Sequence, residues 1–141
     1  MTDNQIQLIQ NNWKILLPDV HAIADAFYDH LFNRFPEIKA LFPGEPHLQV
    51  EKLGDMLEYI VLHLDRLDIL LPQIQLMGIR HQRYRVESAH YVPVGEALIF
   101  ALEKHLQEDW TPALRDAWLA AYQLMAEVML GAYNDDLEVM G

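Results

Sequence analysis

The sequence contains no cysteine among its 141 residues. Disulfide bridges, iron–sulfur clusters, thiolate zinc sites, cysteine nucleophiles and thioether-linked cofactors are therefore excluded. Any metal must be bound by histidine, by carboxylates or by an exogenous ligand. Local disorder signals are also missing, because 52% of the residues are hydrophobic and only 22% are charged. A chain of this length and composition is typical of one folded domain.

Positive charge is scarce. The chain has 10 lysine and arginine residues against 21 aspartate and glutamate residues, and its formal net charge is −11. Such a chain would repel a phosphate backbone, so nucleic acid is excluded as a leading partner. No apolar run approaches the ~18 residues that would span a bilayer, and the N-terminus has no cationic region before an apolar run. We therefore expect a soluble, cytoplasmic protein with no membrane partner.

Strand-like alternation of apolar and polar residues is nearly absent, and apolar residues recur at spacings of three and four instead. Thr2 and Gln5 have the form of a capping box, and Thr111 followed by Pro112 is a strong start signal for a last helix that ends near Gly131. About seven helices are expected, with further starts near residues 18, 34, 48, 72 and 90. Because there is no linker or repeat, we predict one all-α domain over residues 1–141, with helix packed on helix.

A histidine ends the apolar row of the fifth expected helix. Leu70, Ile74 and Met77 precede His81 at spacings of four, three and four, which places His81 on the core-facing side. Residues 80–85 also contain three arginines. A histidine hydrogen-bonded in the core, beside a solvated loop, is the ordinary interpretation. A flat apolar ligand with carboxylates at one edge would match both features, and haem is such a ligand, because a neutral imidazole binds its iron.

Three segments carry a resemblance to a known family. They are AFYDHLFNRFPEIKALF at 26–42, GIRHQRYRV at 78–86 and HYVPVGEAL at 90–98. In order and approximate spacing the chain resembles bacterial single-domain globins, especially the globin domain of flavohaemoglobins and neuroglobin-like microbial haemoglobins. The similarity runs from about Ile6 to Ala132. It implies the globin fold, about seven helices around a haem pocket, with a non-covalent haem b as cofactor.

On this resemblance His81 is the proximal iron ligand, and Phe42 is the phenylalanine that packs against the porphyrin. Arg80 is expected to contact a propionate of the haem. The other proximal contacts implied for the cofactor are Tyr91, Val86, Val94 and Leu98.

The distal side is carried over in the same way. Tyr28 matches the distal tyrosine, while Gln49 and Leu53 match the distal polar residue and the apolar residue over the iron. This match requires a short corner before residue 49, and a different placement of the gap would give the distal position to Lys52 or His47. Hydrogen bonds from Tyr28 and Gln49 would slow the release of dioxygen.

Flavohaemoglobins support the proximal histidine with a tyrosine and a glutamate, which makes the imidazole more electron-donating. Tyr91 has the spacing of that tyrosine. The glutamate position falls near Tyr133, with Asp135 and Asp136 just beyond. We therefore expect a weaker electronic push here than peroxidase-like or nitric-oxide dioxygenase chemistry requires.

The resemblance also implies small residues where two helices cross closely, here Ala24 and Gly54. The function implied is reversible binding of O2, and also of CO and NO, at a histidine-ligated iron, for oxygen binding, transport, storage or scavenging. One alternative is a nitric oxide dioxygenase or peroxidase-like enzyme served by an external reductase. A second is a haem-free globin-fold module for sensing or interaction, and a helical bundle without cofactor is the third.

Overall fold

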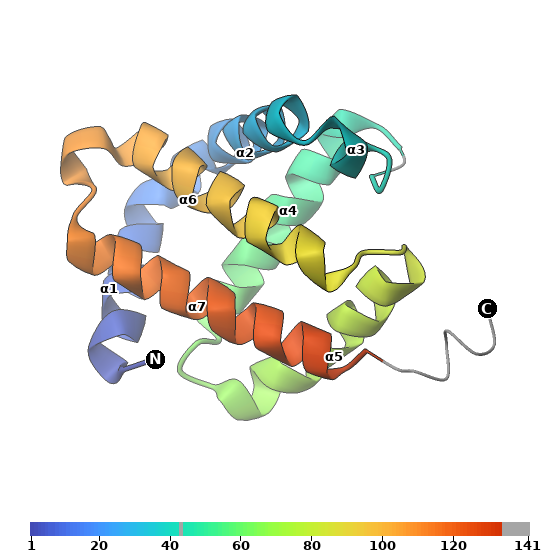
Figure 1. Ribbon diagram of the computed structural model, residues 1–141. Helices are drawn as coiled ribbons and strands as arrows, with labels where there is room; N and C mark the ends of the chain where they lie inside the picture. The colour runs from blue at the N-terminus through green and yellow to red at the C-terminus, as the bar shows by residue number, and fades with distance from the viewer. Residues whose placement is uncertain (43, 134–141) are drawn as a thin grey trace.

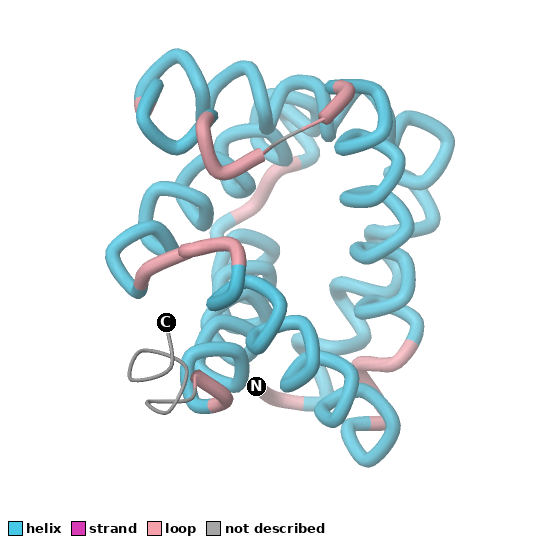
Figure 2. The backbone as a smooth tube through the Cα atoms, turned by 90° about the vertical axis from the view of Figure 1, so that its right-hand side faces the viewer, coloured by secondary structure: helices cyan, strands magenta, loops and turns pink. Residues whose placement is uncertain are grey.

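The structure, a computed structural model, describes residues 1–42 and 44–133. Within these ranges it contains helices and loops and no strand (Figure 2). The helices are α1 (Asp3–Leu16), α2 (Val20–Arg34), α3 (Pro36–Lys39), α4 (Pro46–Leu62), α5 (Leu67–Arg83), α6 (Tyr91–Leu106) and α7 (Pro112–Gly131), with short 3-10 turns η1 (Leu17–Asp19), η2 (Ser88–His90) and η3 (Gln107–Asp109). The all-α prediction is confirmed. No helix in the described part of the chain is long and apolar enough to cross a membrane.

Local signals set several of the helix ends. The capping box is present at α1, where the Thr2 hydroxyl accepts from the Gln5 backbone and the Gln5 side chain accepts from the Thr2 backbone. The Thr111 hydroxyl caps α7 in the same way, with Pro112 as its first residue. Both predicted helix starts are therefore confirmed.

The expected start of α5 was wrong. The helix begins at Leu67, and Pro72 lies inside it rather than at its first turn. A proline there removes one backbone N–H and leaves the carbonyl of Asp68 without its usual intrahelical donor. Both Asp68 and Pro72 are exposed, so water can donate a hydrogen bond to that carbonyl, and the helix continues past Pro72.

The helices pack in crossed pairs around one core. The main contacts join α2 to α6, α5 to α7, α1 to α7 and α2 to α4. Figure 1 shows α6 and α7 running antiparallel across the front of the molecule, with α4 behind them. The largest fully buried side chains come from α1, α2, α4, α5 and α6 and include Ile9, Leu31, Val61, Ile74 and Leu102. Asn12, a buried polar residue of α1, accepts a 2.9 Å hydrogen bond from the indole N–H of Trp118 and ties α1 to α7.

The approach at Gly78 is tighter than the one at Gly54. At Gly54, a Cβ would lie 3.4 Å from Val20, which is ordinary contact between α4 and the start of α2. At Gly78, a Cβ would lie only 2.4 Å from the carbonyl oxygen of Met129. Glycine is therefore required where α5 crosses α7, one helical turn before His81.

Candidate functional site

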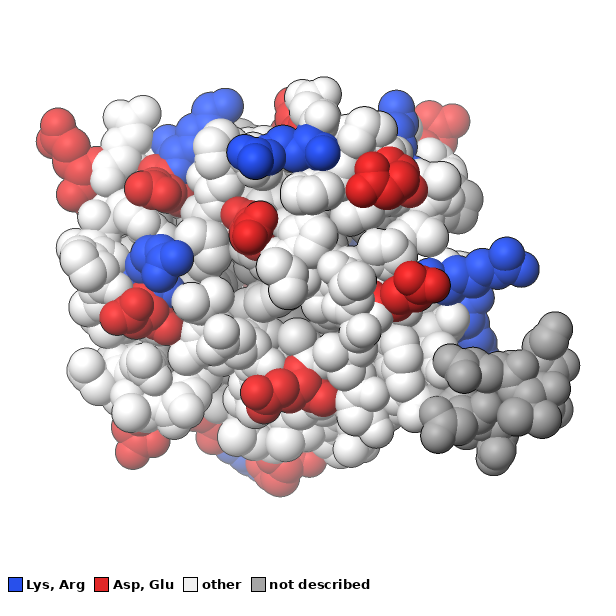
Figure 3. All heavy atoms as spheres, in the orientation of Figure 1, with Lys and Arg blue, Asp and Glu red and all other residues white. Residues whose placement is uncertain are grey.

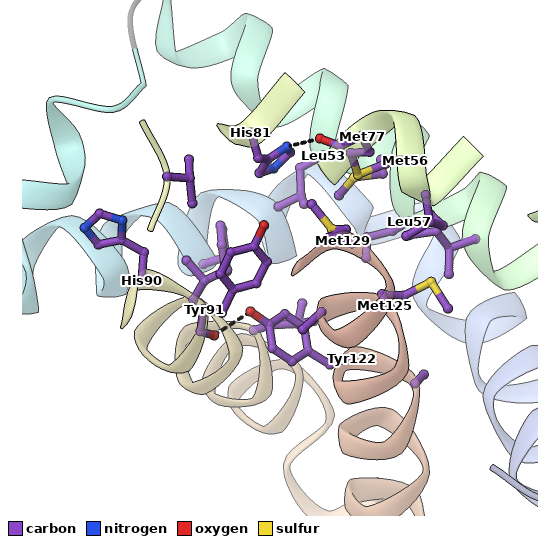
Figure 4. A pocket seen from close by; sticks show the side chains of 18 of the residues that line it. Leu53, Met56, Leu57, Met77, His81, His90, Tyr91, Tyr122, Met125 and Met129 are labelled. Carbon is purple, nitrogen blue, oxygen red and sulfur yellow. Dashed lines mark hydrogen bonds between the residues drawn. The ribbon is translucent and has the colours of Figure 1, made fainter. Parts of the chain in front are cut away.

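A deep apolar cavity lies between the helices and opens at the surface. It contains about 1030 Å³ of space, its mouth included, and residues from α2 to α7 line it. Most of the lining is aliphatic, aromatic or thioether. The histidines and tyrosines among the lining residues are His81, His90, Tyr91 and Tyr122. Figure 4 shows His81 and Tyr91 on facing walls at one end, with Met125 and Leu57 deeper inside.

His81 has the geometry of a neutral metal-binding imidazole. Its Nδ1 lies 2.8 Å from the carbonyl oxygen of Met77, one turn earlier on α5. A carbonyl only accepts, so Nδ1 carries the proton and Nε2 keeps its lone pair. Burial lowers the pKa of His81, and the charge of Arg80 lowers it further, while the bond to Met77 acts in the opposite direction. The imidazole is therefore neutral at physiological pH.

The wall contributed by α4 and the preceding corner is apolar. Phe42, Leu53, Met56, Leu57 and Ile60 line the cavity there. The structure thus brings Phe42 and Leu53 to the same cavity as His81, as the sequence predicts. None of these five side chains can donate a hydrogen bond, so a polar ligand would need a donor from elsewhere.

The two predicted distal donors lie behind that wall. Tyr28 packs edge-on against Phe42, with ring centroids 5.6 Å apart, and is not among the cavity-lining residues. Its hydroxyl donates to the backbone carbonyl of Gln49 at 3.3 Å. Burial raises the pKa of Tyr28 to about 12, so the hydroxyl remains a donor. Gln49 is half-buried and also lies outside the lining.

The basic residue predicted at the propionates and the two alternative distal residues are exposed. Lys52, Arg80 and His47 lie at the surface and do not line the cavity, and Arg83 and Arg85 are exposed beside them on the chain. Figure 3 shows acidic and basic groups scattered over one face, with several basic groups at its right-hand edge. Arg80, Arg83 and Arg85 are close neighbours of His81 in the sequence.

The cavity wall opposite His81 contains a set of hydrogen-bonded tyrosine hydroxyls. Tyr91, the first residue of α6, lines the cavity, and its hydroxyl lies 2.9 Å from that of Tyr133. The Tyr133 hydroxyl donates to the carbonyl of Val86 at 2.7 Å, and the hydroxyl of Tyr122 donates to the carbonyl of Tyr91. Burial raises the pKa of Tyr91 and of Tyr122, which keeps both phenols protonated. Asp135 and Asp136, which the sequence places just beyond the expected glutamate position, lie outside the described residues.

The remaining predicted contacts, Val86, Val94 and Leu98, also line the cavity. Sequence reasoning missed four methionines in the same lining, Met56, Met77, Met125 and Met129, and it missed Tyr122. Met77 and Met125 belong to apolar rows of their helices, so the sequence predicts that both side chains point inward. The sequence does not predict that they line the same cavity. Methionine side chains are flexible and polarizable, so this wall can adapt to the shape of a ligand.

Comparisons with known proteins agree with this architecture. The Globin family matches residues 25–129 of the chain. A flavohemoprotein of Bacillus subtilis (strain 168) is 27% identical over 142 residues, which cover 98% of this chain and 36% of that protein. The chain thus spans about a third of the length of that relative.

Two solved structures are similar over nearly their whole length. An engineered carbene transferase made from an inferred nitric oxide dioxygenase of Rhodothermus marinus superposes with a TM-score of 0.88 at 28% identity, covering 99% of this chain and 98% of that chain. A bacterial globin from Campylobacter jejuni superposes with a TM-score of 0.81 at 25% identity, covering 93% and 95%.

Proposed function

This chain belongs to the globin family, and we propose that it is a haem protein that reversibly binds O2, CO and NO at an iron held by His81. The observation that carries the proposal is the cavity itself. Its walls are apolar, and His81 is placed there with Nδ1 donating to the Met77 carbonyl. This arrangement gives a ligand pocket one nitrogen lone pair, Nε2, for a metal.

The residues present fit haem in chemistry. Phe42, Leu53, Val94 and Leu98, from the corner before α4, from α4 and from α6, give the cavity apolar walls. A porphyrin needs such walls for its faces, whereas its carboxylates must stay near water or cations.

Each part of the site has a distinct role in this proposal. When bound, haem supplies a ferrous iron that takes up one diatomic gas. His81 binds the iron through Nε2, and the Met77 carbonyl fixes the tautomer and ring orientation. Arg80 offers an exposed guanidinium to a carboxylate at the cofactor's edge. Leu53 and Met56 exclude water from the side where the gas enters.

Reversible binding is favoured over enzymatic turnover by the partner of His81. A backbone carbonyl is a neutral acceptor, and it draws less on the Nδ1 proton than a carboxylate would. The imidazole therefore stays close to a neutral histidine rather than gaining imidazolate character. A nitric oxide dioxygenase activity, as the name of one structural relative suggests for that protein, would also need a reductase as partner.

Titration of the purified chain with haemin tests the proposal. We expect a Soret band that saturates at one haemin per chain, shifts on reduction with dithionite and shifts again with carbon monoxide. His81→Ala should lose the histidine-ligated spectrum, and added imidazole should restore it by entering the space left by the ring. His63→Ala is the matched control, because His63 ends α4 outside the cavity lining, with its Nδ1 2.8 Å from the Tyr59 carbonyl.

Two results would contradict the proposal. Failure to take up haemin would leave an apolar cavity for another ligand and favour the haem-free interaction module. Uptake with identical spectra in His81→Ala and the wild-type chain would remove His81 as the ligand.

A further inference from the structure

All the sulfur of this chain is present as thioether, and most of it lies in the cavity. The sequence has no cysteine and six methionines, and four of the six line the cavity, namely Met56, Met77, Met125 and Met129. Peroxides oxidise cysteine thiolates and also convert methionine to its sulfoxide. In a chain without thiols, a peroxide that enters the cavity can therefore meet sulfur only as thioether.

The four thioethers differ in exposure. Met56 on α4 and Met77 on α5 are half-buried, whereas Met125 and Met129 on α7 are only 6% and 7% exposed. We call Met56 and Met77 the outer thioethers and the two residues of α7 the inner thioethers. Oxidation follows access to the sulfur, so the outer thioethers should react first.

The neighbours of the outer thioethers make their oxidation consequential. Met77 precedes His81 by one turn on α5, and its carbonyl accepts the Nδ1 proton of that ring at 2.8 Å (Figure 4). Met56 follows Leu53 by three residues on α4, and both side chains line the cavity. An oxygen atom added to either sulfur would therefore enter the wall beside His81 or the wall formed by α4.

The apolar wall offers a sulfoxide oxygen no hydrogen-bond donor. Oxidation turns the apolar methionine side chain into a polar one that accepts hydrogen bonds. The side chains that line the cavity beside Met56 carry no donor, and they are those of Phe42, Leu53, Leu57 and Ile60. Burying an acceptor without a partner costs free energy, so the oxidised wall must rearrange or admit water. Both changes disfavour an apolar ligand.

We propose that the outer thioethers are a modification site for hydroperoxides, and that their oxidation weakens the binding of an apolar ligand in the cavity. In the reaction, the sulfur lone pair attacks the terminal O–H oxygen of the peroxide, an S–O bond forms and the O–O bond breaks. The sulfur loses two electrons and becomes a sulfoxide. The peroxide gains these electrons, and the proton of the attacked oxygen passes to the departing oxygen, which leaves as water or an alcohol. The reaction needs no cofactor, and only its consequence for haem rests on the proposed function.

Treatment of the haem-free chain with hydrogen peroxide tests the site. We expect peptide mass spectrometry to show that each outer thioether gains an oxygen atom roughly tenfold faster than either inner thioether, because susceptibility follows exposure. Met1, which is 43% exposed, gives the rate at an open position. In urea, where the chain is unfolded, the four cavity methionines should react at equal rates. Equal rates in the folded chain, or faster oxidation of the inner thioethers, would overturn the site.

Haemin titration tests the consequence for the ligand. The peroxide-treated wild-type chain should bind haemin roughly tenfold more weakly than the untreated chain, and methionine sulfoxide reductases should restore its affinity. The double variant Met56→Leu and Met77→Leu should keep its affinity under the same treatment, since leucine is close to methionine in volume and has no sulfur. Met125→Leu is the matched control, and it should stay as sensitive to peroxide as the wild type.

The effect on the ligand can fail separately from the modification. Selective oxidation of the outer thioethers with unchanged haemin affinity would overturn that effect. An equal loss of affinity in the treated double variant would assign the loss to other residues and would overturn it as well. A wild-type chain that takes up no haemin before treatment would refute the proposed function instead, and the oxidation rates would still decide the modification site.

Discussion

Replacing Gly78 by alanine should drive α5 and α7 apart at their crossing. A Cβ at Gly78 would lie 2.4 Å from the carbonyl oxygen, 2.7 Å from the Cα and 2.9 Å from the carbonyl carbon of Met129. Since real Cβ contacts essentially never fall below 3.0 Å, the two backbones must separate by roughly 0.6 Å or more. Overpacking of this kind costs about 1 to 3 kcal/mol, while alanine is favoured over glycine in a helix by about 1 kcal/mol. We therefore expect a net loss of up to about 2 kcal/mol.

The assay is urea or thermal unfolding of the haem-free chain, followed by circular dichroism. A loss of up to about 2 kcal/mol should lower Tm by up to roughly 8 °C in a chain of this size. His81 lies almost one turn beyond Gly78, so haemin affinity should fall as well. Gly131→Ala is the control, because nothing lies within 4 Å of its Cβ, and it should be neutral or slightly stabilising. Equal stability of the two variants would refute the close crossing.

Two further predictions concern the site. In the proposed function, the Tyr28 hydroxyl leaves the Gln49 carbonyl and donates to the bound gas. Tyr28→Phe should then speed dioxygen dissociation about tenfold, which corresponds to ~1.4 kcal/mol. An unchanged rate in stopped-flow measurements would assign Tyr28 to packing alone. Because the pKa of His81 is lowered in the folded chain, its contribution to stability is present above the unfolded value of about 6.5 and is lost as pH falls through the folded value. Urea midpoints of the haem-free chain between pH 7 and 5 should therefore fall more steeply for the wild type than for His81→Gln, and parallel curves would contradict the shift.

The helices could be predicted from sequence where their signals are local. Thr2 and Thr111 determine helix starts through bonds that reach only three residues along the chain. The start of α5 could not be predicted from Pro72, because the cost of an internal proline depends on whether water reaches the carbonyl four residues earlier. That exposure is a property of the folded surface. The same limit applies to Gly78, since its partner Met129 comes from another helix.

The candidate site divides in the same way. Helical spacing indicates which face a residue occupies, so Leu53, His81 and Leu98 could be assigned inward, and all three line the cavity. Spacing does not give the direction of a hydroxyl at the end of a long side chain. Tyr28 illustrates this, because its ring packs on Phe42 while its hydroxyl donates to a backbone carbonyl. The partner of Tyr133 likewise depends on a contact across 47 residues of sequence.

Two long-range contacts, one on α5 and one in the loop after it, suggest which helix determines the position of the imidazole. Gly78 meets the backbone of Met129 just before the His81 turn, and Tyr133 holds Val86 just after it. Met129 and Tyr133 are four residues apart at the end of α7, so one short stretch contacts both sides of the proximal segment. The Tyr28 hydroxyl instead contacts the first turn of α4. Because the two sets of contacts share no partner, substitutions on the α4 side should alter gas binding without changing how firmly His81 is held.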